Sequence, residues 1–252
     1  PVWTWDASTK GTGAWQTDLA ANPYVFEYTR NDSATPAEVE CHDPTWQPST
    51  DLEDGTYTVR VKAIDAVGNE TGWVDGDTYI CDNLPPTITG FTNPTPNPGT
   101  NKKPRWTWTA SDWQYGSGIA TTGGYYVEVS NDSGSTWTFY TGNETNPSWT
   151  PASDLTDGRY TIRVSAKDAA GNTSGPFMGG EYRLDTTVPD DVGTIAVPSP
   201  SPGNNKRPAW SWARPSDGSG TGVSAYHVEI SRDGDPYAAA DPALVQTTAA
   251  TA

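Results

Sequence analysis

Oxygen-bearing side chains recur in two matching turns of this sequence, and their types would suit a calcium ion. Asp65 and Asn69 lie in the turn IDAVGN, and Asp168 and Asn172 lie in the turn KDAAGN. Ca²⁺ is bound by hard oxygen ligands, chiefly carboxylates and amide or backbone carbonyls. The two turns therefore predict one kind of calcium site that occurs twice.

Two aspartates in the linkers are the third part of this predicted site. Asp82 and Asp185 each stand four residues before a proline, and we expect them to come near the same end of a domain as the turns. A calcium ion held by a turn and a linker would stiffen the joint between domains. The alternative is that Asp and Asn only stabilise a hairpin turn, with Gly68 and Gly171 in the left-handed conformation. The sequence leaves both interpretations open and predicts no other cofactor.

Catalytic constellations are not evident in the sequence. His42 and His227 are the only histidines, and neither recurs with a Ser, Cys or Asp companion, as a triad would require. No Cys/His set has zinc spacing, and no glycine-rich phosphate loop opens a helix. We therefore expect no enzyme active site in these residues.

One segment has the pattern Ser-x-Asp-x-Gly-x-Thr-Trp, which resembles the Asp-box hairpins of sialidase propeller blades. It spans Ser130–Trp137 and occurs once in full. The Asp side chain of such a segment can accept hydrogen bonds from the turn, while the Trp packs beneath it. We interpret it as a stabilised hairpin.

The elements that must position these residues are revealed by an internal repeat. The motif Trp-x-Trp occurs at Trp3, Trp106 and Trp210, with spacings of 103 and 104 residues. The block TWQPSTDLEDGTYTVRVKAIDAVGNETG returns as SWTPASDLTDGRYTIRVSAKDAAGNTSG, again 103 residues later. A period of this length is too long for a solenoid repeat and matches one β-sandwich domain.

The repeat predicts three units, with boundaries just after the linker aspartates. They are residues 1–82, 83–185 and 186–252. The first unit lacks the stretch equivalent to residues 83–103, and the third lacks its C-terminal strands. We expect the chain to be part of a longer array; the alternative is that neighbouring chains supply the missing strands.

Alternation of apolar and polar residues predicts antiparallel β-strands, each with one buried face. The inward positions recur between units, as do the Trp-x-Trp pairs, which we interpret as core residues. These inward positions are Tyr57, Val59, Val61 and Ala63; Tyr160, Ile162, Val164 and Ala166; Tyr24, Phe26 and Tyr28; Tyr125, Val127 and Val129; and Tyr226, Val228 and Ile230.

The motif Leu-x-Asp-Gly-x-Tyr occurs at Leu52–Tyr57 and Leu155–Tyr160. It predicts a tight turn and a tyrosine corner, in which the Tyr hydroxyl bonds to the preceding backbone. With the Val/Ile-Arg-Val-x-Ala-x-Asp-x-x-Gly-Asn that follows, it resembles the later strands of fibronectin type III and bacterial immunoglobulin-like repeats. The Asp-x-x-x-Pro linkers resemble those of large bacterial adhesins and surface stalks. The resemblance implies an all-β protein of tandem antiparallel β-sandwich domains in an extended array.

The composition of the chain narrows the classes of partner that it is expected to bind. The net charge of −16 disfavours nucleic acid and anionic membranes, and no apolar run is long enough to span a bilayer. Cys41 and Cys81 both lie in the first unit, and the sequence leaves open whether they form a disulfide.

The functional hypothesis is an extracellular spacer or adhesin/filament building block at the bacterial cell surface. Its expected partners are neighbouring repeats of the same protein, through self-assembly into a filament or surface layer. The alternatives are a carbohydrate-binding module, using Trp15, Trp73, Trp113 and Trp137 as stacking rings, and an accessory region of a large secreted hydrolase.

Overall fold

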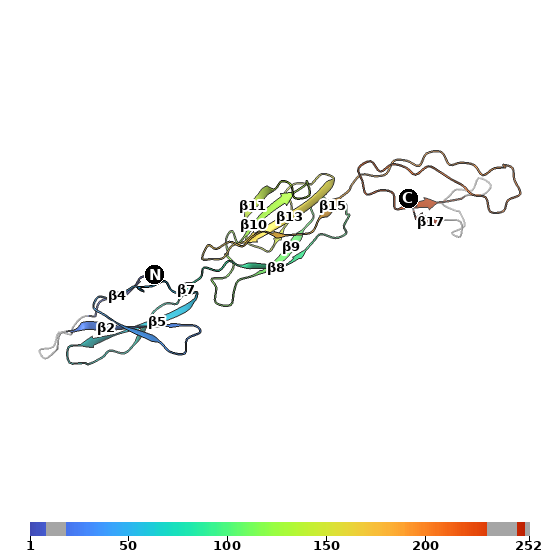
Figure 1. Cartoon of the computed structure of the whole chain (residues 1–252). Helices are drawn as coiled ribbons and strands as arrows, with labels where there is room; N and C mark the ends of the chain where they lie inside the picture. The colour runs from blue at the N-terminus through green and yellow to red at the C-terminus, as the bar shows by residue number, and fades with distance from the viewer. Residues whose placement is uncertain (9–18, 231–245, 250–252) are drawn as a thin grey trace.

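The computed structural model describes residues 1–8, 19–230 and 246–249. Within those ranges the secondary structure is β-strand only, and no helix there is long and apolar enough to cross a membrane. Three groups of strands follow one another along the chain (Figure 1). The all-β fold with tandem antiparallel sheets, predicted from the sequence, is confirmed.

The first group contains two sheets. The larger has the strand order β3-β2-β5-β6, with β7 also paired to β5, and the smaller pairs β1 with β4. The strands are β1 (Trp3–Thr4), β2 (Leu19–Arg30), β3 (Ala37–Cys41), β4 (Thr45–Trp46), β5 (Gly55–Asp65), β6 (Val74–Asp75) and β7 (Tyr79–Cys81).

The second group repeats this arrangement and adds one strand. Its larger sheet has the order β11-β10-β13-β14, with β15 also paired to β13, and its smaller sheet has the order β12-β9-β8. The strands are β8 (Thr87–Thr92), β9 (Trp106–Ser111), β10 (Tyr125–Ser130), β11 (Thr138–Glu144), β12 (Ser148–Trp149), β13 (Gly158–Ala166), β14 (Phe177–Met178) and β15 (Tyr182–Leu184).

The third group is the smallest among the described residues. It contains β16 (Ala225–Val228) paired with β17 (Gln246–Ala249), and an isolated bridge joins Ala196 to Ser211. The boundaries drawn at Asp82 and Asp185 stay predictions, but every described sheet lies within one of the three predicted units.

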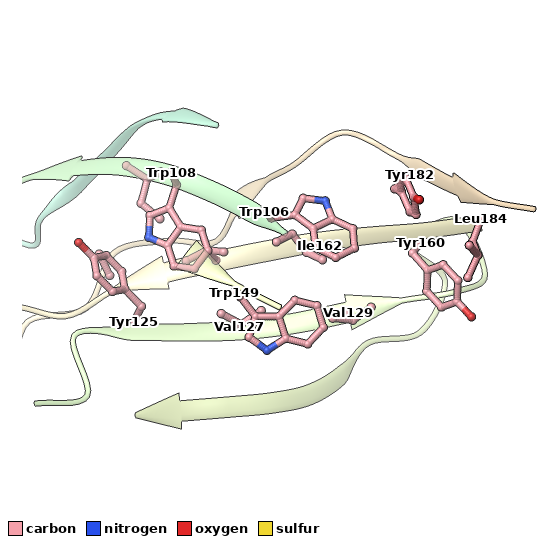
Figure 2. Close-up of a cluster of buried hydrophobic side chains, with 13 residues drawn as sticks. Trp106, Trp108, Tyr125, Val127, Val129, Trp149, Tyr160, Ile162, Tyr182 and Leu184 are labelled. Carbon is pink, nitrogen blue, oxygen red and sulfur yellow. The ribbon is translucent and has the colours of Figure 1, made fainter. Parts of the chain in front are cut away.

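The core of the second unit lies between its two sheets. Trp106 from β9 has no exposed surface, and Ile162 and Val164 from β13 are equally buried. Figure 2 shows the Trp106 and Trp108 rings between β9 and the sheet that carries Val127 and Ile162. The prediction that the Trp-x-Trp residues are core residues is confirmed here, because both rings of the pair are almost completely covered.

The second Trp of each pair meets an aromatic partner in the same geometry in all three units. The three pairs are Trp5–Tyr24, Trp108–Tyr125 and Trp212–Tyr226, with ring centroids 5.5, 5.3 and 5.3 Å apart and interplanar angles of 73°, 74° and 76°. The first Trp also recurs, because Trp3–Trp46 and Trp106–Trp149 pair across β-strands in the same register. The units therefore pack equivalent rings in equivalent places.

The predicted alternation is confirmed along β13, where Tyr160, Ile162 and Val164 are buried. It is wrong at Ser130, which follows the inward Val129 and should therefore point outward but is 2% exposed. Ser130 is buried because its hydroxyl donates to Asp132 at 2.7 Å and accepts from the Gly134 amide at 2.8 Å. The hairpin, not the strand parity, determines its position.

Both predicted tyrosine corners are present. The Tyr57 hydroxyl donates to the Glu53 carbonyl at 2.9 Å, and the Tyr160 hydroxyl donates to the Thr156 carbonyl at 2.7 Å. Each ring is buried. The corner ties the turn before β5 or β13 to the core.

The two cysteines are free thiols. Cys41 pairs with Tyr24, which pairs with Ala63 at one end of β5, whereas Cys81 pairs with Gly55 at the other end. The length of β5 between these positions is about 26 Å at the usual rise per residue. A disulfide needs Cα atoms within about 7 Å, so Cys41 and Cys81 cannot bond within one chain.

Candidate functional site

The two joints between units are built from the same pair of aspartates. The first of each pair is the Asp of Leu-x-Asp-Gly-x-Tyr, which holds the residue after the linker aspartate. Asp54 accepts from the backbone amide and the side-chain amide of Asn83, at 3.0 and 2.8 Å. Asp157 accepts from the backbone amide and hydroxyl of Thr186, at 3.0 and 2.7 Å. The motif therefore fixes the start of each linker as well as the turn.

The linker aspartate of the first joint reaches into the following unit. One oxygen of Asp82 accepts from the backbone amide and the hydroxyl of Ser117, both at 2.7 Å. The other accepts from the Leu84 amide at 3.1 Å and from the Trp113 indole N–H at 3.3 Å. Asp82 is 8% exposed, so these bonds form away from most solvent and join the end of one unit to a loop of the next.

The second joint repeats this arrangement. Asp185 accepts from the Thr221 backbone amide with one oxygen and from the Thr187 amide with the other, the latter at 3.2 Å. Arg183 adds a contact of its own, because its guanidinium donates to the Gly220 carbonyl at 2.6 Å. Asp185 thus holds a loop of the third unit as Asp82 holds a loop of the second unit.

The loop that receives each linker aspartate has its own internal aspartate, which the sequence analysis missed. Asp112 accepts from the Gly118 amide at 2.7 Å, and Asp217 accepts from the Gly222 amide at 2.6 Å. Gly118 and Gly222 have φ values of 78° and 90°, a left-handed conformation in which glycine is favoured. The signal was present in the sequence as Ser-Asp, then Gly-Ser/Thr-Gly-Ile/Val, at residues 111–119 and 216–223.

Three carboxylates meet at the first joint. Oxygen atoms of Asp82, Asp112 and Asp168 all lie within 4.8 Å of one another. Asp168 is 1% exposed and accepts from the backbone and side-chain amides of Asn172, at 2.8 and 2.9 Å. The Asn172 side chain also donates to the Asp82 carbonyl at 3.0 Å. The structure therefore brings together Asp82, Asp168 and Asn172 of the predicted calcium site.

The remaining predicted calcium ligands lie elsewhere. Asp65 accepts from the backbone and side-chain amides of Asn69, both at 2.8 Å, which repeats the Asp168–Asn172 turn in the first unit. Asp185 lies at the second joint and contacts Thr221. Each linker aspartate turns toward the unit that follows it, because the loop amides that it accepts from belong to that unit.

The electrostatics of the joints favour ionised aspartates. Burial raises the pKa of Asp82, but the hydrogen bonds from Ser117 and Leu84 outweigh it and hold the pKa below its usual value. Bonds from Thr221 lower the pKa of Asp185, and bonds from Thr186 and Thr187 lower the pKa of Asp157. Hydrogen bonds to the charged form cause all three shifts.

The residues at the first joint partly fit a divalent cation. Three neighbouring carboxylates repel one another, and among the described residues none of the three forms an ion pair with Lys, Arg or His. Ca²⁺ takes six to eight oxygen ligands, so three carboxylates would need waters or backbone carbonyls to complete the shell. Asp82 already accepts four hydrogen bonds, which leaves Asp112 and Asp168 as the carboxylates with more free lone pairs.

The other residues whose side chains were considered for chemistry contact neighbouring residues of the chain. The side chains of His42 and His227 contact Asp43 and Glu229 on exposed surface. Asp132 of the Asp-box segment accepts from the amide and hydroxyl of Thr136, and these bonds lower its pKa to about 2. The segment is a stabilised hairpin, as predicted.

The outlying tryptophans that were considered for sugar stacking are engaged with the protein. Arg60 lies over the Trp73 ring at 4.4 Å, and Arg163 lies over the Trp137 ring at 4.5 Å. Trp113 donates to Asp82 and is half-buried. Trp15 lies outside the described residues.

Comparison with known proteins gives one family match, within the second unit. A family model described as a bacterial Ig-like domain matches residues 116–186. This range includes the receiving loop at Ser117, the Asp-Gly turn and the linker aspartate of the second joint. Most of the second unit is thus similar to a bacterial Ig-like domain, and the predicted resemblance to bacterial immunoglobulin-like repeats is confirmed over residues 116–186.

One solved structure to which the chain is similar contains the FN1–FN3 domains of chicken CNTN1. The match has 16% sequence identity and a TM-score of 0.35, and it covers 98% of this chain and 80% of that one. No curated protein matches the chain.

Proposed function

We propose that this chain is a stretch of an extracellular bacterial spacer, in which Ig-like units are held at defined angles by their joints. The observation that carries the proposal is the repetition of one joint: Asp54 with Asp82, and Asp157 with Asp185, make equivalent hydrogen bonds about a hundred residues apart. Domains that share only a flexible linker have no need of such bonds. The chain's role is then mechanical, with no catalytic activity of its own.

A rigid spacer requires that the bonds at a joint reach across it, and they do so in both directions. Asp54 belongs to the unit before the first joint and holds Asn83 after it. Asp82 belongs to the end of the earlier unit and holds Ser117 of the later one. Because both contacts use charged acceptors and short distances, they are stronger than neutral hydrogen bonds.

The test of this role is whether neighbouring units tumble together. Residual dipolar couplings give an alignment tensor for each unit; a rigid joint gives equal tensors for the first and second units, and a flexible joint gives unequal ones. The spacer proposal predicts equal tensors. Unequal tensors in the unaltered protein would refute it.

We further propose that Ca²⁺ binds at the first joint and stiffens it, through Asp82, Asp112 and Asp168. The support is the approach of three carboxylates without a cationic neighbour among the described residues. The ion would neutralise their mutual repulsion, and Asn172 would orient Asp168. Calorimetric titration with Ca²⁺ tests this directly: heat that is lost in Asp112→Asn supports the site, and an unchanged titration in that variant contradicts it.

A further inference from the structure

The larger sheet of the second unit carries an ordered row of four side chains on its outer face. Phe139 of β11 pairs with Glu128 of β10, which pairs with Arg163 of β13. Arg163 in turn pairs with Met178 of β14. Residues directly opposite each other in neighbouring strands point to the same face of a sheet. Val164, the next residue along β13, is completely buried, so these four residues, the outer row, point away from the core.

The two ends of the outer row are apolar and exposed. Phe139 and Met178 are 58% and 52% exposed in the whole chain. The Phe139 ring lies 6.3 Å from the ring of Tyr126, which is the next residue along the same face of β10. Trp137 adds a further ring, because Arg163 lies over it. Apolar side chains gathered on one face of a soluble domain indicate a surface that binds a partner.

The centre of the outer row is an ion pair. The Arg163 guanidinium donates to both carboxylate oxygens of Glu128, at 2.6 and 2.9 Å, and each side chain is 28% exposed. The two charges cancel, although the chain as a whole has a net charge of −16. The outer row therefore adds no repulsion of its own when another surface approaches it.

The equivalent row of the first unit keeps the ion pair but has charged ends. Glu27 of β2 pairs with Arg60 of β5, and the Arg60 guanidinium donates to the Glu27 carboxylate at 2.8 Å. The ends of this row are Glu38 of β3 and Asp75 of β6, where the second unit has a phenylalanine and a methionine. The sheet thus accepts acidic residues at both end positions, so its fold does not require the apolar ends of the second unit.

Across the four strands, the outer row has the order apolar, acidic, basic, apolar, which is complementary to its own reverse. Two such faces related by a two-fold axis along the strands place Phe139 of one copy opposite Met178 of the other. The same axis places each Glu128 opposite the other copy's Arg163. An axis across the strands would instead place Glu128 opposite itself, and like charges disfavour that arrangement. The row of the first unit has no such match, because its two acidic ends would face each other.

We propose that two copies of the chain associate face to face through the outer rows of their second units. The interface uses the same surface on both copies, as two-fold symmetry requires. Face-to-face sheets pack with their strands nearly aligned, and rotation about an axis along the strands leaves the strand direction unchanged. The two chains therefore run in the same direction. This association does not depend on the rigidity of the joints, which the alignment tensors test separately.

The size of the face determines how strong the association is. Four strands of about six residues each cover an area of about 14 Å by 20 Å at the usual strand spacing and rise. A stable interface buries roughly 800 Å² on each partner, which is more than this face offers. We therefore expect weak association, with a Kd in about the micromolar to millimolar range.

Sedimentation velocity of the whole chain at increasing concentration tests the proposal. The double variant Phe139→Glu, Met178→Asp gives the second unit the row of the first unit, a row that the fold accepts, and it should weaken association about tenfold or more. The matched control is Val67→Glu, Val188→Asp, which adds the same two charges at side chains that are 68% and 80% exposed; it should leave association unchanged.

Two results of this experiment overturn the proposal. One is a chain that stays monomeric up to about 1 mM, and the other is equal association of the two double variants. If the monomeric chain is instead retained on a neutral polysaccharide, and Phe139→Glu abolishes the retention, the face binds sugar through its rings and not a second copy.

A mixing experiment tests whether the charges of the two copies face each other. Glu128→Arg and Arg163→Glu each place like charges opposite one another, so each variant alone should associate less than the unaltered chain. An equimolar mixture should regain association, because one face then carries two bases and the other two acids. Mixing cannot repair an ion pair within one chain, so an intrachain role alone predicts no recovery. A mixture that associates no better than the separate variants contradicts the proposal.

Discussion

The change that probes the joint most directly is Asp82→Asn. The substitution keeps the shape of the side chain but replaces one acceptor oxygen by an amino group that can only donate. Whichever way the amide turns, its amino group faces two donors. These are the amide and hydroxyl of Ser117 on one side, or the Leu84 amide and the Trp113 indole on the other.

The magnitude follows from these contacts. Hydrogen bonds to a charged acceptor each contribute about 1.5–3 kcal/mol, and the Ser117 hydroxyl can rotate to recover one of them. We therefore expect a loss of about 3 kcal/mol in the free energy of unfolding of the second unit. For a unit of this size the melting temperature should fall by about 10 °C or more.

Calorimetry measures that loss, and residual dipolar couplings measure what happens to the joint. Asp82→Asn should make the alignment tensors of the first and second units unequal. Asp132→Asn is the control, because Asp132 also accepts several hydrogen bonds but only within its own hairpin; it should lower the melting temperature and leave the tensors equal. If Asp82→Asn changes neither quantity, the linker aspartate does not hold the joint and the reasoning fails.

Three further expectations follow from the same contacts. Lower pH should loosen both joints: the pKa values of Asp82, Asp157 and Asp185 are depressed below 3.8 in the folded chain, so their contribution is present above that value and is lost as pH falls below it. Dipolar couplings recorded on either side of this window check the direction, and equal tensors well below it would contradict it. Tb³⁺, used in place of Ca²⁺, should luminesce on excitation of Trp113 and lose that signal in Asp112→Asn but not in Asp217→Asn; equal signals in both variants would argue against the first joint as the site. Tyr160→Phe should cost the second unit about 1 kcal/mol, the contribution of one hydrogen bond. Tyr126→Phe should cost less, because among the described residues the Tyr126 hydroxyl has no hydrogen-bond partner. Denaturant unfolding measures both losses, and equal losses would show that the tyrosine corner is not the cause.

The sequence predicted the fold well because its signals were local and repeated. Period-two alternation placed Ile162 and Val164 in the core, and both are buried. The Asp-Gly-x-Tyr motif predicted the hydroxyl bonds of Tyr57 and Tyr160. In each case the residues that interact are close in sequence or recur at one fixed spacing, so a pattern suffices to find them.

The first joint was predicted only in part, because the residues that bond across it are distant in sequence. The linker aspartates were expected near the turns at one end of a domain, but the pairing of Asp82 with Asp168 was not specified. Asp112 was not considered, since its loop has no counterpart of the turns from which the site was predicted. Asp82 contacts Ser117 across 35 positions and Asn172 across 90. Periodicity within a strand carries no information about such contacts. Only comparison of residues 111–119 with 216–223 would have revealed the conserved form of the loop within this chain.

The Trp-x-Trp pair shows why strand parity predicts the direction of a side chain more reliably than its burial. Trp212 packs on Tyr226 just as Trp108 packs on Tyr125, since both rings of each pair come from neighbouring segments of one unit. Trp106 is covered because Trp149 of β12 and Tyr182 of β15 also pack on it, and both of those strands follow much later in the chain. Trp210 has no such partners among the described residues and is 42% exposed. Burial of the first Trp therefore depends on strands that the local pattern does not contain. Strands packed on Trp210 in the same way should bury its ring and protect its fluorescence from a quencher in the solvent.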